Sequence, residues 1–173
     1  VQTCALPILV SGRTALTPPP FVRVVPVVTA RDMYEAVTSV SQEQDIIIKA
    51  AAVQCSPGLY SQAGTVKKIC DTILELGQQG VQFAVFPETV VPYYPYFSFV
   101  QPPFAMGKEH LKLLHESVVV PSAATALIGQ ACKEANMVVS VGINERAGGT
   151  IYNAQLLFDA DGSIIQHRRK ITP

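Results

Sequence analysis

The chain has 173 residues, a formal net charge of zero at pH 7, and 49% hydrophobic against 15% charged residues. This composition is typical of one globular domain of ordinary size, and it is too apolar for intrinsic disorder. Without net positive charge or a long apolar run of roughly 18 residues, neither a nucleic acid nor a membrane is expected as a partner.

The N-terminal segment, residues 1–45, differs from the rest of the chain. It contains five prolines and shows no sustained helical or strand period. Its first eight residues, VQTCALPI, match the translation of a common sequencing-library adapter. We therefore predict that residues 1–45 are a non-native or disordered segment, with Met33 as the best candidate for a natural start. One domain is then expected over residues 46–173.

A strand–helix–strand pattern opens this domain. Residues 46–54, IIIKAAAVQ, are β-branched or small and predict a strand. Ser61 or Thr65 can cap a helix that ends near Gly80. Residues 82–86 predict a second, buried strand. Short loops on both sides of the helix indicate parallel strands joined by a right-handed crossover.

The stretch at residues 85–104 holds seven of the 13 aromatic residues, five prolines and a single charge, Glu88. A carboxylate at the C-terminal end of a buried strand, opening a stiff aromatic loop, is placed like an active-site group. An apolar pocket around it would raise the pKa of Glu88 and make it a better base near neutral pH. The alternative is an exposed glutamate in a packing or interface loop.

The remaining elements alternate between helical and strand patterns. Polar residues Asn144, Glu145 and Arg146 follow the third buried strand and are expected at its C-terminal end. In chain order we expect helices at 108–117 and 121–136, a strand at 137–143, and a hairpin of strands 151–158 and 163–167 around the turn at 159–162.

Seven short motifs in a fixed order resemble the nitrilase (carbon–nitrogen hydrolase) superfamily over residues 46–173, in particular the aliphatic and cyanobacterial-type nitrilases. The resemblance implies an α/β fold, the N-terminal half of a four-layer α-β-β-α sandwich. The matching residues are Ala52-Val53-Gln54, Phe86-Pro87-Glu88, Pro92-Tyr93-Tyr94-Pro95, Val141 to Arg146, Tyr152-Asn153, Phe158 to Gly162 and Arg168 to Pro173.

The same resemblance implies a Glu-Lys-Cys catalytic set. Glu88 matches the general base, and Lys170 matches the lysine that stabilises the tetrahedral intermediate. The cysteine nucleophile is expected beyond Pro173, so the 173-residue chain is predicted to be inactive. Tyr93 or Tyr94 is expected to face the substrate. No metal or organic cofactor is expected.

Asn144 is predicted to bind substrate, and Asn144 and Glu145 are predicted to support the catalytic residues, with a role in a hairpin turn as the alternative for both. The function predicted for the complete protein is hydrolysis of a small nitrile to a carboxylic acid and ammonia, through a cysteine thioimidate and thioester. The alternatives are an amidase or carbamoylase of the same superfamily and a non-catalytic half-domain.

Four scattered cysteines without a CxxC pair indicate reduced thiols and a cytoplasmic protein. Cys70 and Cys132 lie on apolar helix faces and are expected to be small core residues, and no catalytic role is expected for Cys55. Members of the family assemble into dimers and spirals, so the complete protein is expected to be a homo-oligomer.

Overall fold

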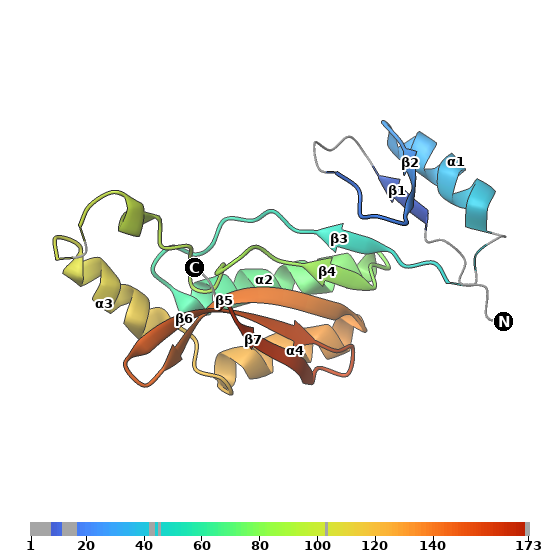
Figure 1. The fold of residues 1–173 in the computed structure, drawn as a ribbon. Coiled ribbons are helices and arrows are strands. Elements are labelled where there is room, and N and C mark those ends of the chain that lie inside the picture. Colours follow the sequence, from blue (N-terminus) through green and yellow to red (C-terminus); the bar gives the residue numbers. More distant parts are fainter. Residues whose placement is uncertain (1–7, 12–16, 42–43, 45, 103, 172–173) are drawn as a thin grey trace. The chain divides into compact units, whose positions relative to one another are not determined.

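A computed structural model describes residues 8–11, 17–41, 44, 46–102 and 104–171. The chain divides into two compact units, Val1–Ile47 and Ile48–Pro173. The suspected adapter lies almost entirely outside the described residues. Each unit is described by itself below, and Figure 1 gives the elements.

The first unit contains a pair of short parallel strands, β1 (Ile8–Ser11) and β2 (Arg23–Pro26). They are followed by helix α1 (Ala30–Ser41). These elements disagree with disorder over the described residues, and a non-native origin of residues 1–45 stays a prediction. The two strands could not be predicted from the sequence because each has only four residues, too few to show a period.

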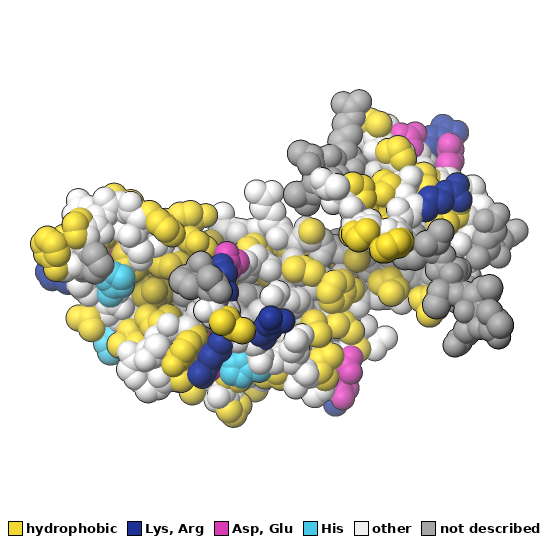
Figure 2. Space-filling view, in the orientation of Figure 1, with side chains coloured by type: hydrophobic (Ala, Val, Ile, Leu, Met, Phe, Trp, Pro, Cys, Tyr) yellow, Lys and Arg dark blue, Asp and Glu magenta, His cyan; other side chains and the backbone are white. Residues whose placement is uncertain are grey.

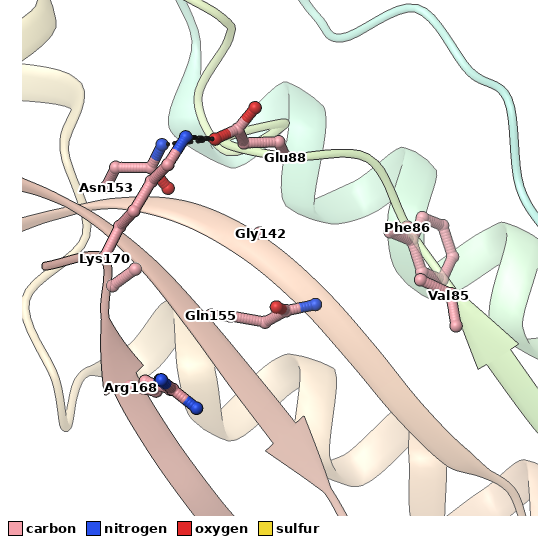
Figure 3. Close-up of a pocket in the computed structure, with 9 residues that line it drawn as sticks. Val85, Phe86, Glu88, Gly142, Asn153, Gln155, Arg168 and Lys170 are labelled. Atoms are coloured by element: carbon pink, nitrogen blue, oxygen red, sulfur yellow. Dashed lines mark hydrogen bonds and ion pairs between the residues drawn. The ribbon is translucent and has the colours of Figure 1, made fainter. Parts of the chain in front are cut away.

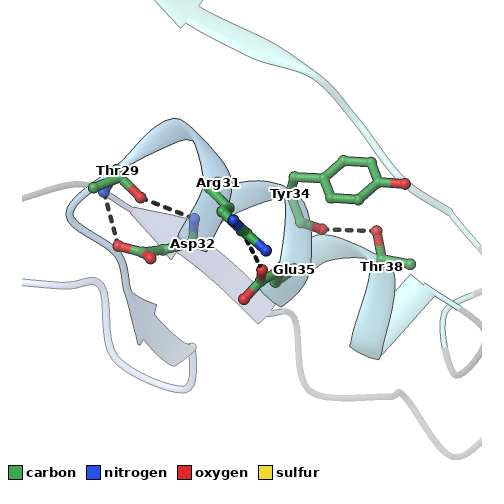
Figure 4. A network of polar contacts seen from close by, with 6 residues as sticks. All are labelled: Thr29, Arg31, Asp32, Tyr34, Glu35 and Thr38. Atoms are coloured by element: carbon green, nitrogen blue, oxygen red, sulfur yellow. Dashed lines mark hydrogen bonds and ion pairs between the residues drawn. The ribbon is translucent and has the colours of Figure 1, made fainter.

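Helix α1 begins with a reciprocal pair of capping hydrogen bonds (Figure 4). The Thr29 amide donates to the Asp32 carboxylate at 2.9 Å, and the Asp32 amide donates to the Thr29 hydroxyl at 3.1 Å. These bonds satisfy backbone donors that the first helical turn leaves free. An exposed ion pair one turn apart, Arg31 to Glu35 at 2.9 Å, adds little.

The second unit is built on a five-stranded sheet in the order β3-β4-β5-β6-β7. Strands β3 (Ala50–Ala52) and β4 (Phe83–Val85) are parallel and are joined by helix α2 (Gln62–Gln78). Ser61 caps α2, since its hydroxyl accepts a hydrogen bond from the Gly64 amide at 3.0 Å. The predicted strand–helix–strand unit is confirmed, although β3 is much shorter than residues 46–54.

The other three strands follow helices α3 (Gly107–Glu116) and α4 (Ala123–Ala135). Strand β5 (Val138–Ala147) runs parallel to β4, and β6 (Thr150–Phe158) and β7 (Ile164–Arg169) continue the sheet antiparallel. Gly162 has a φ of 89° in the β6–β7 turn, as expected for a glycine at this position.

Strand β5 extends beyond its predicted end at Ile143. Asn144, Glu145 and Arg146 pair with β6 instead of following the strand. A hairpin-turn role for Asn144 is therefore wrong, because the turn lies after Ala147. The segment could not be identified as a strand from its sequence because three consecutive polar residues break the apolar run.

Helices α2 and α4 pack side by side on one face of the sheet, as Figure 1 shows. Alternate residues of β5 and β6 point toward these helices and form the centre of the core. A four-residue 3-10 helix, η1 (Tyr96–Phe99), interrupts the loop before α3. The core side chains of β5 and β6 are Val139, Val141, Ile143, Ala154, Leu156 and Phe158.

No helix in the described part of the chain is long and apolar enough to cross a membrane.

Candidate active site

A carboxylate and an ammonium group that lie 82 residues apart in the sequence meet at one end of the sheet. Lys170 Nζ donates to Glu88 Oε1 at 2.8 Å. Asn153 Nδ2 donates to the same oxygen at 2.6 Å (Figure 3). The three side chains come from the loop after β4, from β6 and from the residue after β7.

The Glu88 loop lies directly against β5. The Phe86 amide donates to Ser140 O at 2.8 Å, and the Asn144 amide donates to Val91 O at 2.7 Å. Between these two contacts the chain passes over Gly142, whose Cα carries no side chain to obstruct it. A Cβ added there would lie 2.4 Å from Pro87 O and 2.8 Å from the Glu88 Cα.

Asn144 holds the far end of the same loop. It is buried, and its Nδ2 donates to Tyr93 O at 2.8 Å. A longer contact joins Nδ2 to Thr89 O at 3.5 Å. The Nδ2 group of Asn144 therefore bonds backbone carbonyls, which fits the expected supporting role better than contact with a substrate.

Lys170 is placed by the end of β7. Its amide donates to Asn153 O at 2.8 Å, one residue beyond the strand. Because side chains alternate along a strand, Arg168 and Lys170 share the face of the sheet that α2 and α4 do not cover. Figure 2 shows basic side chains over β6 and β7, next to hydrophobic ones.

A cavity of about 430 Å³ opens on this face beside the pair. Its walls combine apolar and polar groups, as in many sites for small molecules. The side chains that give it this character are Val85, Phe86, Glu88, Gln155, Arg168 and Lys170 (Figure 3).

The charges of the pair stabilise each other. The hydrogen bond from Lys170, followed by that from Asn153, holds the pKa of Glu88 below its ordinary value. The hydrogen bond to Glu88 and its negative charge raise the pKa of Lys170. The expectation that an apolar pocket raises the pKa of Glu88 is therefore wrong here. The two side chains are 46% and 47% exposed, so burial is too small to oppose the pairing.

The two candidate tyrosines occupy different environments. Tyr93 is only 3% exposed, and its ring meets the edge of Tyr60 at 5.3 Å between centroids. Burial raises the pKa of Tyr93 to about 12. Tyr94 is half-buried and adds to the raised pKa of Lys170, after the larger contributions of Glu88. Neither tyrosine is among the residues that line the cavity.

Replacing Tyr93 by Phe is expected to leave the free energy of unfolding unchanged or to raise it by up to about 1–3 kcal/mol. The reason is that the Tyr93 hydroxyl is buried without a hydrogen-bond partner among the described residues. Urea denaturation of the chain measures this. Tyr93→Ala is the matched variant that removes the ring, and it should cost about 3–5 kcal/mol. A large loss from Tyr93→Phe would show that the hydroxyl makes a stabilising bond.

The cysteines of the described residues do not form part of this site. None of them is among the residues that line the cavity. Burial raises the pKa of Cys55 and of Cys70, and it raises the pKa of Cys132 to about 12. Since the thiolate is the nucleophile, these shifts make all three poor candidates for covalent catalysis. Cys4 lies outside the described residues.

Roles for Asn153 and Gly142 were not predicted from the sequence. Asn153 lies within a family motif, but nothing local indicates that its side chain bonds Glu88 in the loop after β4. Gly142 did carry a signal, since an isolated glycine in an apolar strand often marks close approach of another backbone segment.

The fold and the pair define an α/β protein with a carboxylate–ammonium site at the edge of a cavity. Residues 49–173 match the family model described as carbon–nitrogen hydrolase. The chain belongs to the carbon–nitrogen hydrolase family. Residues 2–78 also match the model described as DNA/pantothenate metabolism flavoprotein C-terminal domain, which covers less than half of the chain.

Two curated relatives carry nitrilase names. The chain is 65% identical over 129 residues to Nitrilase 3 from an unknown prokaryotic organism, covering 73% of the chain and 39% of that relative. It is 50% identical over 127 residues to a nitrilase of Paraburkholderia phymatum, covering 73% of the chain and 37% of the relative. The chain thus spans well under half the length of these relatives.

A solved structure supports the fold. An amidase from Nesterenkonia sp. aligns with a TM-score of 0.55 at 13% identity, covering 75% of this chain and 46% of that one. The predicted fold class is confirmed at this level. One sheet with one helical layer corresponds to the N-terminal half of the nitrilase-type sandwich.

Proposed function

We propose that the chain supplies the general base and the stabilising cation of a nitrile-hydrolysing site. The observation that carries the proposal is the 2.8 Å contact between Glu88 and Lys170, because it joins the two residues that match the catalytic positions of the family. The high identity to a relative named nitrilase favours a nitrile over an amide as substrate.

In the proposed reaction, a cysteine thiol supplied by the rest of the complete protein attacks the nitrile carbon. Glu88 takes the thiol proton and passes it to the nitrile nitrogen as the carbon–sulfur bond forms, which gives a covalent thioimidate and restores the carboxylate. Water adds to the thioimidate, ammonia leaves, and a thioester remains. A second water, activated by the same carboxylate, releases the carboxylic acid. The Lys170 ammonium stabilises negative charge on the tetrahedral intermediates.

The pairing has a chemical consequence for this mechanism. A carboxylate with a lowered pKa is ionised at neutral pH and able to accept a proton, but it is a weaker base than an unpaired one. A covering layer in the complete sandwich would exclude water from the pair and oppose this effect. We therefore expect the pKa of Glu88 to be higher in the complete domain, and Glu88 to be a stronger base there than in this chain.

A hybrid protein tests the proposal. Residues 46–173 would replace the matching part of the 65%-identical relative, which then provides the remainder of the domain. We expect ammonia and a carboxylic acid from a small aliphatic nitrile. Ammonia released only from the corresponding amide would favour the amidase alternative. A folded hybrid without activity toward either substrate would favour the non-catalytic alternative.

We further propose that the 173-residue chain is inactive by itself, because the three thiols in the described part of the chain, those of Cys55, Cys70 and Cys132, do not line the cavity. Cys55→Ala and unmodified chain should both fail to release ammonia, and activity lost only on that substitution would contradict this. A cytoplasmic location and homo-oligomeric assembly of the complete protein remain predictions from the cysteine pattern and the family resemblance.

We also propose that residues 1–45 are foreign to the hydrolase domain. The family match begins at residue 49, and the boundary between the compact units lies at Ile47–Ile48. The match of residues 2–78 to a flavoprotein domain model does not separate the two parts, because it overlaps the hydrolase match over residues 49–78. Mass spectrometry of the native protein provides the test, since a peptide covering residues 17–31 would contradict the proposal.

A further inference from the structure

Lys170 sits at an end of the sheet where little packing holds it. Of the six residues of β7, five are exposed and Ile164 is partly buried. The single backbone bond from the Lys170 amide to Asn153 O extends the pairing by one residue. A strand end with so few buried contacts is prone to fray. Something besides the strand ladder must therefore fix the position of the ammonium group.

A buried carboxylate on the opposite face of the sheet provides such a contact. Glu145 on β5 is 2% exposed. Its two oxygens accept hydrogen bonds from Arg169 Nε at 2.8 Å and Arg169 Nη2 at 2.7 Å. His167 Nε2 lies 2.8 Å from Oε2. The Arg169 guanidinium also lies 4.0 Å from the centroid of the Tyr152 ring. Two parallel bonds and a ring contact give Arg169 one defined geometry.

The alternation of side chains connects this contact to the active site. Arg169 and Lys170 are consecutive, so their side chains leave the backbone toward opposite faces of the sheet. Fixing the Arg169 side chain on one face fixes the backbone from which Lys170 reaches Glu88 on the other. We propose that Glu145 is a positioning residue, which acts through Arg169 to hold the Lys170 ammonium against Glu88. This inference rests on the proposed function of the Glu88–Lys170 pair.

Asn144, which precedes Glu145 on β5, holds the loop that carries Glu88. Asn144 points to the other face and holds the Glu88 loop through Tyr93 O. Asn144 and Glu145, consecutive residues of β5, thus hold the segments that carry Glu88 and Lys170. The separation of carboxylate and ammonium depends on a rigid central strand rather than on the exposed ends that carry them.

The alternative is that Glu145 and Arg169 only fasten the edge of the sheet. Both roles predict a loss of stability when Glu145 is changed. Only the positioning role predicts that the electrostatic environment of Glu88 also changes, because Glu88 and Glu145 share no hydrogen-bond partner among the described residues. The titration of Glu88 therefore separates the two roles.

The experiment is an NMR titration of the Glu88 carboxyl carbon in the 173-residue chain labelled with ¹³C-glutamate. The Glu88 signal is assigned by its loss in Glu88→Gln. Lys170→Met serves as the reference, because removing the ammonium group is expected to shift the titration midpoint of Glu88 upward. We expect Glu145→Gln to produce at least half of that shift, since glutamine has one acceptor oxygen and no negative charge and cannot accept both hydrogen bonds from Arg169.

His167→Ala is the matched control, because it removes one contact to Glu145 and leaves Arg169 in place. It should leave the Glu88 midpoint unchanged. If Glu145→Gln fails to fold, judged from the backbone amide signals of β5 and β6, Arg169→Lys decides, since lysine keeps the charge but cannot form the two parallel bonds.

An unchanged Glu88 midpoint in a folded Glu145→Gln or Arg169→Lys protein, with a clear shift in Lys170→Met, would overturn the inference. That result would leave the proposed function intact. Failure of the proposed function appears in a different measurement, the absence of ammonia release by the hybrid.

Discussion

Replacing Glu88 by Gln in the hybrid hydrolase should lower nitrile turnover by about 10²–10⁴-fold, the usual contribution of a general base. Glutamine has nearly the same shape but cannot take a proton from the nucleophile or from water. The thermal unfolding midpoint should hardly change, because both side chains of the Glu88–Lys170 pair are about half exposed and such pairs contribute little to stability. Ammonia release and calorimetry measure the two effects separately.

Lys170→Met provides the second arm of this prediction. It removes the ammonium but keeps a side chain of similar length, and a loss of about 10²–10³-fold is expected. If the two residues act as a unit, the double variant should be little worse than the poorer single variant. Glu134→Gln, on the exposed surface of α4, is the matched control. Turnover that survives Glu88→Gln within a factor of two would remove Glu88 from the mechanism.

The pairing of Glu88 with Lys170 shows what a sequence reveals of a site and what it leaves out. The resemblance identified both residues as catalytic candidates, and the strand–helix–strand pattern placed Glu88 after a buried strand. Neither showed that Lys170 lies 2.8 Å from Glu88, because that distance depends on the register of β6 and β7. The predicted direction of the Glu88 pKa shift was wrong for this reason.

The polar end of β5 illustrates a second limit. Asn144 and Glu145 interrupt an apolar run, and local pattern places such residues outside a strand. They lie inside β5 because each has its polar groups satisfied by a distant segment. Asn144 bonds the loop carbonyl of Tyr93, and Glu145 bonds Arg169. Where a strand depends on partners that are distant in sequence, its end cannot be predicted from the local alternation of apolar and polar residues.

Gly142→Ala is expected to destabilise the chain by about 1–3 kcal/mol, the usual cost of overpacking a close contact. The added Cβ would lie 2.4 Å from Pro87 O and 2.5 Å from Thr89 N. Both are backbone atoms, so no flexible side chain can move aside. The Glu88 loop has to lift away from β5, which displaces the carboxylate from Asn153 and Lys170. Urea denaturation of the chain measures the first effect.

The hybrid hydrolase measures the second effect of Gly142→Ala. Displacing a catalytic group by about 1 Å can cost on the order of 10²-fold in turnover, so activity should fall even at temperatures where the variant is fully folded. Gly149→Ala is the matched control, since an added Cβ there meets no atom within 4 Å. If Gly142→Ala loses stability but keeps full turnover, the loop tolerates displacement. The close packing of β5 against residues 87–89 would then serve folding rather than the placement of Glu88.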